Sequence, residues 1–253
     1  MPVPEPLPEQ RRSEVLRQSL SVGIATGAYG ISFGALSVAA GLTLWQTIAL
    51  SGLLFSGASQ FAVVGIIAAG GSGAAAVATS SLLGLRNGLY GLQVSRLLQV
   101  KGLRRVPAAQ LTIDESTAVA IAQPEQSAQR LGFWSTGLSV YVLWNLSTVL
   151  GAVVGDAIGD PRRYGLDAAA PAAFCALLWP RLRSRDARAV AAAAAVIALF
   201  VAPHAPAGVP VLVAALAAVV AGLLPPRDQR GQDEPPEPDN RGASTSLDGE
   251  DPR

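Results

Sequence analysis

A single arginine, Arg86, lies in the middle of apolar sequence and is the first residue that could do chemistry. The 68 residues before it, 18–85, contain no Asp, Glu, Lys, Arg or His. A guanidinium in hydrocarbon is costly unless it is paired or hydrated, and its fork can hold a carboxylate through two hydrogen bonds. We therefore expect Arg86, with the adjacent Asn87, to bind a substrate carboxylate. The alternative is an internal salt bridge to Asp114 or Glu115.

A cluster of small residues, SGASQ from Ser56 to Gln60, interrupts the same apolar run. Such clusters mark close helix packing or a helix that breaks at membrane depth. A break leaves backbone N–H and C=O groups free, and these can bind the carboxylate or the ammonium of a small zwitterion. We expect Gly57, Ser59 and Gln60 to contact such a substrate. The alternative for Gln60 is a hydrogen bond between helices.

Asp114 and Glu115 lie between two short apolar pieces, in a segment too short and too polar to span a bilayer. A carboxylate near the membrane can take up a proton during a transport cycle, so we expect this pair to gate the path or carry a proton. The alternative is a loop at headgroup level, or a short helix that is capped by Thr112 or Asp114. Trp144, in an uncharged stretch, is expected either to line the path or to serve in packing.

The composition excludes several function classes. One cysteine, Cys175, and one histidine, His204, cannot build a disulfide or a typical metal cluster within the chain. No nucleophile is paired with a base and no phosphate-binding loop is present, so we expect no enzyme activity and no cofactor. A net charge of +1 gives no signal for nucleic-acid binding.

The elements that must position these residues are membrane helices. Half of the 253 residues are hydrophobic and 15% are charged, against about 25% charged in soluble domains. We predict an all-α integral membrane protein: a polytopic helical bundle with about six or seven membrane segments, one broken or re-entrant. A largely disordered leader (1–18), in which residues 11–18 could form a short surface helix, precedes the transport domain (19–226), and a disordered acidic tail (227–253) follows it. The expected segments are 21–40, 44–70, 73–98, 131–155, 168–180 and 189–226, the last divided into two by a turn at Pro203–Pro206.

The positions of the charges predict the orientation. Basic stretches at 96–105 and 181–188 are expected in the cytoplasm, together with the C-terminus. Three full crossings before Lys101 would place the N-terminus outside, whereas a hairpin broken at SGASQ would place it inside, and we favour the hairpin. Four glycines spaced three or four residues apart are expected to pack helices tightly, although bare backbone could instead line a path; they are Gly23, Gly27, Gly30 and Gly34.

At these same positions the chain resembles the AzlC family, the large subunits of branched-chain amino-acid exporters. The resemblance covers about 19–225. It is carried by GISFGALSVAAGL from Gly30, FSGASQFAVVGIIAAG from Phe55, LLGLRNGLYGLQVSRLL from Leu82 and LTIDESTAVA from Leu111. The family pattern around the arginine is close to Asn-Leu-Arg-His, whereas Arg86 here has different polar flanks, with Asn87 after it.

The resemblance implies a bacterial cytoplasmic (inner) membrane protein that exports valine, leucine, isoleucine or methionine with a small AzlD-like membrane subunit. We expect a secondary transporter driven by an ion gradient, specifically the proton gradient. The alternatives are a transporter of another small solute and a membrane assembly subunit that transports nothing.

Overall fold

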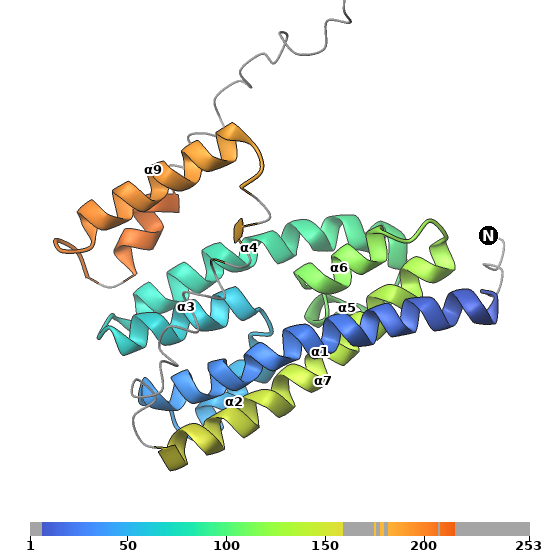
Figure 1. Cartoon of the computed structure of the whole chain (residues 1–253), viewed down its shortest axis with the longest axis horizontal. Coiled ribbons are helices and arrows are strands. Elements are labelled where there is room, and N and C mark those ends of the chain that lie inside the picture. The colour runs from blue at the N-terminus through green and yellow to red at the C-terminus, as the bar shows by residue number, and fades with distance from the viewer. Residues whose placement is uncertain (1–6, 159–174, 176–177, 180–181, 207, 216–253) are drawn as a thin grey trace, which may run out of the picture.

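The computed structural model describes residues 7–158, 175, 178–179, 182–206 and 208–215, and within this part the regular structure is helical (Figure 1). The helices are α1 (Glu9–Ala39), α2 (Leu44–Leu53), α3 (Gly57–Ala68), α4 (Gly73–Leu98), the 3-10 turn η1 (Gly102–Arg104), α5 (Arg105–Gln110), α6 (Asp114–Ile121), α7 (Gln126–Ile158) and α9 (Arg185–Val201).

Two of the described helices, α1 and α7, are long and apolar enough to cross a membrane by length and composition. The α4 helix has 26 residues but carries Arg86 and Arg96, and α3 is a shorter apolar helix. Most of the expected segment 168–180, most of the second half of the 189–226 hairpin, and the acidic tail lie outside the described residues. The count of six or seven segments therefore stays a prediction.

The α1 and α7 helices lie side by side and run in the same direction, because contacts advance together along both (Figure 1). The Ser19 hydroxyl accepts hydrogen bonds from Ser135 and Thr136 at one end. Further along, a Cβ added to Gly30 would lie 2.6 Å from the Trp144 carbonyl oxygen, and one added to Gly34 would clash with the Thr148 carbonyl. The predicted use of the glycines in tight packing is confirmed.

The first helix begins at Glu9, well before the expected span. Residues 9–18 are helical, which corrects the leader prediction for Glu9 and Gln10 and agrees with the short-helix alternative for residues 11–18. Polar side chains of this segment contact the residues that immediately precede α7, and these contacts stabilise the helical leader. Arg11 donates to Gln123 at 2.8 Å and lies 3.5 Å from Glu125, and Gln18 accepts from Gln123.

The predicted break is present: α2 ends at Leu53, and α3 begins at Gly57. The α2 helix starts with a capping box, in which the Thr43 hydroxyl accepts from the Gln46 N–H and the Gln46 side chain accepts from the Thr43 N–H. The end of α2 contacts the middle of α7, where Ser51 donates to Thr148 at 3.3 Å. The following helix, α3, packs against α4.

The broken segment is a hairpin that returns to the end where it started. The α4 helix then runs the length of the bundle, and its last turn meets the start of α7, where the Arg130 guanidinium donates to the Leu97 carbonyl. The start of α1 also meets the start of α7. The N-terminal end of α1 and the loop that carries Lys101 therefore lie at the same end of the bundle, as the hairpin version predicts.

The predicted turn at Pro203–Pro206 is also confirmed. The α9 helix ends at Val201, a turn follows, and residues 209–215 are helical again. A Cβ added to Gly208 would lie 3.1 Å from Ala75 and Ile66, which places the residue after this turn against α3 and α4.

Candidate functional site

A cavity of about 80 Å³ lies between α1, α3, α4, α6 and α7. Thr26, Arg86 and Trp144 line it, and each lies near the middle of its long helix. Since one water needs roughly 10–15 Å³, the cavity can hold several waters or a compact solute. Its lining combines charged groups, backbone at a helix start and aromatic rings; the residues are Thr26, Tyr29, Phe55, Ser56, Gly57, Ala58, Phe61, Arg86, Ile113, Asp114, Glu115, Val140 and Trp144.

The N-terminus of α3 forms one wall of this cavity. The first N–H groups of a helix have no partner within the helix and carry a partial positive charge. No side chain caps them here: the hydroxyl of Ser56, the N-cap residue, donates to Ser59 instead, and the Ser59 hydroxyl donates to the Ser80 carbonyl at 3.0 Å. The wall at Gly57 and Ala58 therefore favours an anionic group.

The opposite side of the break, the C-terminal turn of α2, is closed by side chains. The Gln60 amide donates to the carbonyls of Leu50 and Ser51 at 3.3 and 3.0 Å. The Gln110 amide donates to the carbonyl of Gly52 at 2.7 Å and to that of Leu53 at 3.4 Å. The Tyr141 hydroxyl also donates to the Gly52 carbonyl. The four orphan carbonyls of the helix end are satisfied in this way.

Arg86 and Asp114 form a salt bridge across the cavity, with Nη1 and Oδ2 separated by 2.8 Å. Their side chains are 32% and 21% exposed, so the pair is largely withdrawn from solvent. The other functional atoms, Nε of Arg86 and Oδ1 of Asp114, are buried and have no hydrogen-bond partner among the described residues. The salt bridge that the sequence left as an alternative is therefore present, and both partners retain unused hydrogen-bonding capacity.

Glu115 follows Asp114 in the first turn of α6, a helix of eight residues that is too short to span a bilayer. Burial raises the pKa of the Glu115 carboxyl, and a hydrogen bond from its own backbone opposes this shift. The negative charge of neighbouring Asp114 raises the same pKa further, whereas the positive charge of Arg86 lowers it. One carboxyl of the pair is thus ion-paired, and the other has a pKa above that of an ordinary glutamate.

The predicted cap of this short helix is wrong. The Thr112 hydroxyl donates to the Ala108 carbonyl in the preceding helix, and Asp114 is already the first helical residue. The Ser116 hydroxyl instead closes the helix start: it accepts from the Ile113 N–H and donates to the Leu111 carbonyl at 2.6 Å. Asp114 is left available to Arg86.

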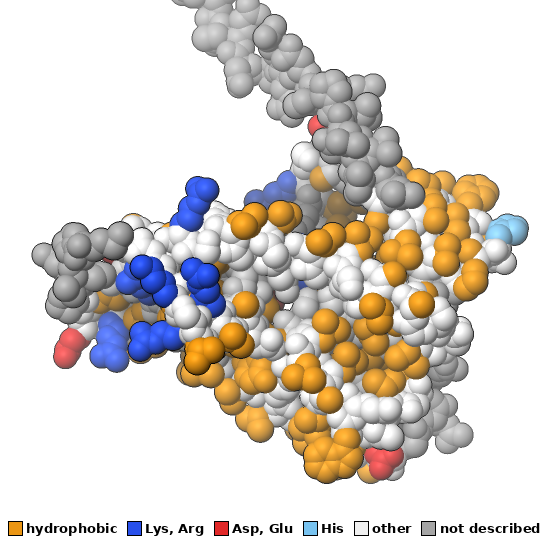
Figure 2. Space-filling model, turned by 180° about the vertical axis from the view of Figure 1, so that it is seen from behind, with side chains coloured by type: hydrophobic (Ala, Val, Ile, Leu, Met, Phe, Trp, Pro, Cys, Tyr) orange, Lys and Arg blue, Asp and Glu red, His pale blue; other side chains and the backbone are white. Residues whose placement is uncertain are grey.

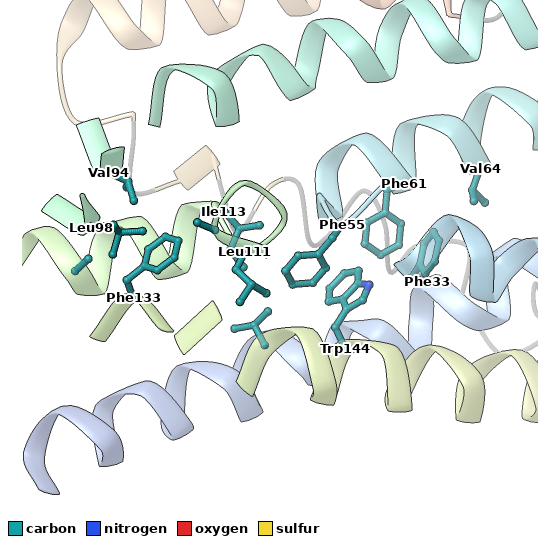
Figure 3. Packing of buried hydrophobic residues seen from close by; sticks show 13 residues of the cluster. Phe33, Phe55, Phe61, Val64, Val94, Leu98, Leu111, Ile113, Phe133 and Trp144 are labelled. Atoms are coloured by element: carbon teal, nitrogen blue, oxygen red, sulfur yellow. The ribbon is translucent and has the colours of Figure 1, made fainter. Parts of the chain in front are cut away.

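Aromatic rings form the apolar wall of the cavity, between α3 and α7 (Figure 3). Trp144 stacks on Phe33 with ring centroids 6.1 Å apart and meets Phe61 edge-on at 6.2 Å. Phe55 lies against Tyr141 at 4.9 Å. The indole N–H of Trp144 is buried without a hydrogen-bond partner in the described part of the chain. Trp144 thus lines the cavity and also packs the core.

Five of the eight predicted site residues line the cavity: Gly57, Arg86, Asp114, Glu115 and Trp144. The other three do not line it. Ser59 and Gln60 are engaged with α4 and α2, so Gln60 makes the link between helices that was its alternative. Asn87 is half-buried, with an unpartnered side-chain oxygen.

Sequence reasoning missed the aromatic residues Phe55 and Phe61, and also Thr26 and Tyr29 of α1. Phe55 and Phe61 flank the SGASQ cluster directly, so their position beside the break was an available signal. Among the described residues, no group of three or more His, Cys, Asp or Glu side chains could hold a metal ion.

Sequence similarity to known membrane proteins extends over the region that forms the cavity. The family model described as "AzlC protein" matches residues 21–158, which is more than half of the chain. The chain is 30% identical to "Inner membrane protein YgaZ" of Escherichia coli over 237 residues, covering 88% of this chain and 93% of that protein.

It is also 31% identical to an "Uncharacterized membrane protein" of Archaeoglobus fulgidus over 171 residues, covering 67% of this chain and 75% of that protein. No solved structure matches. The matched region contains the whole cavity, from Thr26 to Trp144. The chain belongs to the AzlC family of membrane proteins.

Proposed function

We propose that the chain is the large subunit of a secondary transporter that exports branched-chain and related hydrophobic amino acids across the cytoplasmic membrane. The observation that carries this proposal is the mid-depth cavity, where an uncapped helix start, a pair of carboxyls and an aromatic wall surround one space. These three surfaces match the carboxylate, the ammonium and the apolar side chain of such an amino acid.

The substrate carboxylate is received at Gly57 and Ala58, where free N–H groups and the positive end of α3 favour an anion. Arg86 lies on the same cavity and has N–H groups left over from its contact with Asp114, so it adds a second positive contact. Broken helices at mid-depth bind substrate carboxylates in this manner in other transporter folds.

The ammonium of the substrate is received at the carboxyls. The salt bridge to Arg86 holds Asp114 in place, and burial raises the pKa of Glu115, so that this second carboxyl takes up a proton more readily than an ordinary glutamate. A proton and an ammonium then compete for Glu115, so that the arrival of one promotes the departure of the other. Competition of this kind is a direct way to exchange an amino acid for a proton, which makes the proton gradient the driving force.

The apolar side chain of the substrate packs against Phe55, Phe61 and Trp144. Branched aliphatic groups gain free energy from such burial, roughly 1.5–3 kcal/mol for a fully buried side chain. A small AzlD-like membrane subunit completes the transporter, and the membrane face that carries Lys101 and the start of α1 is cytoplasmic.

Efflux of labelled isoleucine from preloaded cells that express the chain with its small partner tests the proposal. We expect Glu115→Gln to reduce efflux and to weaken its response to an imposed proton gradient. Asp156→Asn is the matched control, because this exposed carboxyl of α7 does not line the cavity, and it should leave efflux unchanged. Unlabelled valine, leucine and methionine should compete with isoleucine. Competition by none of them would refute the proposed substrate class.

A further inference from the structure

Two adjoining hollows lie at the turn that follows α4, away from the central cavity. One of about 630 Å³ is lined by Leu98, Gln99, Val100, Lys101, Arg104, Arg130 and Trp134. The other, of about 860 Å³, shares the first four of these residues and adds Arg105, Ala108, Ala109, Thr112 and part of α4 from Gly91. Four cationic side chains therefore surround one turn.

The turn itself is held in a fixed shape. Gln99 and Gly102 both have positive φ, at 52° and 58°. The Arg130 guanidinium donates to the Leu97 carbonyl at 3.1 Å and to the Gln99 side chain at 3.3 Å, which orients it toward the hollow and leaves other N–H groups unused. The Arg105 guanidinium donates to the Val100 carbonyl.

No acidic side chain in the described ranges lies within 4 Å of these four cations, because the ion pairs found there involve only Arg11 and Arg86. Lys101 and Arg104 are exposed and make no hydrogen bond with the described protein. Among the described residues, no carboxylate therefore neutralises the charge at this turn, and two of its four cations, Arg105 and Arg130, are anchored by hydrogen bonds to it.

Apolar side chains accompany these charges. Leu103 is 89% exposed and Val106 is 68% exposed, immediately beside Arg104 and Arg105. Alternating cationic and exposed apolar residues are typical of segments that lie at the boundary between headgroups and acyl chains. Figure 2 shows the visible Lys and Arg side chains gathered mainly at one end of the molecule, with hydrophobic side chains over the rest of that face.

The larger hollow continues along α4 over Gly91, Val94 and Leu98. A Cβ added to Gly91 would meet nothing within 4 Å, so this part of the groove is open. A ligand that fits both hollows needs an anionic head and an apolar chain. The alternative is that these basic side chains only set the orientation of the protein in the membrane. That role would require neither an arginine anchored by hydrogen bonds nor an adjoining apolar groove.

We propose that these hollows bind an anionic phospholipid of the leaflet on the Lys101 side. Its phosphate lies among Lys101, Arg104 and Arg130, and one acyl chain follows α4 past Gly91. Basic pockets between membrane helices bind anionic headgroups by the same chemistry, and the guanidinium of Arg130 suits a phosphate because its donors form a planar fork. This site is independent of which solute the transporter carries.

The charge arm of the test uses the full-length chain in neutral detergent and native mass spectrometry with phosphatidylglycerol or phosphatidylcholine of identical acyl chains. We expect preferential binding of phosphatidylglycerol, weakened about tenfold by Lys101→Gln with Arg104→Gln. The control, Arg12→Gln with Arg17→Gln, removes two exposed cations at the same end of the bundle and should retain wild-type binding. Equal binding of the two lipids, or an equal loss in the control, would overturn the proposal.

A second arm leaves the charge unchanged. Gly91→Leu fills the apolar groove and should also weaken phosphatidylglycerol binding, whereas Gly65→Leu, on α3 and likewise in open space but lining neither hollow, should not. Wild-type binding by Gly91→Leu would overturn the acyl-chain assignment. Inorganic phosphate should not displace the lipid at millimolar concentration; displacement would show a site for soluble anions instead. Unchanged melting temperatures in detergent confirm that each variant is folded.

Discussion

Separating the salt bridge of Arg86 and Asp114 gives the sharpest test of the candidate site. Removing one partner of a buried ion pair costs about 3–5 kcal/mol. Since these side chains keep 32% and 21% of their exposure, we expect less, about 2 kcal/mol, for either Arg86→Gln or Asp114→Asn. For a protein of this size that corresponds to a fall in melting temperature of roughly 4–8 °C.

The charge swap Arg86→Asp with Asp114→Arg should recover most of this loss. Recovery is incomplete because residue 114 is the first residue of α6, where a positive side chain opposes the helix dipole by about 0.3–1 kcal/mol. The coupling energy from the double-mutant cycle of Arg86→Gln, Asp114→Asn and their combination should be favourable and somewhat below about 2 kcal/mol. The control Glu14→Gln, which breaks only an exposed pair with Arg11, should change stability by less than about 0.5 kcal/mol.

Two measurements on wild type, the two single variants and the charge swap separate a role in packing from a role in transport. One is the melting temperature of the detergent-solubilised chain, and the other is isoleucine efflux from cells with matched membrane levels. If Arg86 holds the substrate carboxylate, the swap restores stability but not efflux, because the guanidinium has moved from α4 to α6. Full recovery of efflux by the swap would reduce the pair to a structural role. Unchanged stability and efflux in Arg86→Gln would refute any role for this cation.

Three further outcomes follow from the described contacts. Gln110→Leu removes the shared amide donor to the α2 carbonyls and should lower stability by about 1–2 kcal/mol in a detergent melting assay. Gly34→Ala forces a side chain into the α7 backbone and should cost at least about 1–3 kcal/mol, whereas Gly65→Ala, in open space, should be neutral by the same assay. Because the pKa of Glu115 is raised, wild-type efflux should respond to pH above the range of an ordinary glutamate, and Glu115→Gln should flatten that response.

The long helices and the break could be predicted from the sequence because both are local properties. An uncharged run of helical length can lie only in a membrane or in a protein core. The cluster of small residues that begins at Ser56 marks the point where the helix breaks between α2 and α3. For Arg86 the sequence offered two partners, a substrate carboxylate or an internal salt bridge. The salt bridge could be anticipated because a buried guanidinium requires a partner, and Asp114 and Glu115 are the carboxylates nearest to it in sequence.

Two of the groups that close α2, Gln110 and Tyr141, could not be predicted from the sequence. Gln110 lies 58 residues from the carbonyl it binds, and Tyr141 lies 89 residues away. Neither residue type nor spacing in the sequence links Gln110 and Tyr141 to α2, because any amide or hydroxyl at that depth could donate to the same carbonyl. The contacts of residues 9–18 could not be predicted for a similar reason: their partners Gln123 and Glu125 are more than a hundred residues along the chain.

The closure of α2 determines what the cavity can bind. A helix broken at mid-depth exposes a negative end and a positive end together, and such a site would attract cations and anions alike. Here the carbonyls are occupied by Gln60, Gln110 and Tyr141, whereas the N–H groups at Gly57 face the cavity without a side-chain cap. The backbone therefore contributes only positive potential, and the carboxyls of α6 supply the only negative groups in the described lining. In the binding mode proposed above, carboxylate and ammonium would thus have separate places, and this separation would fix the orientation of a zwitterion before its side chain meets the aromatic wall.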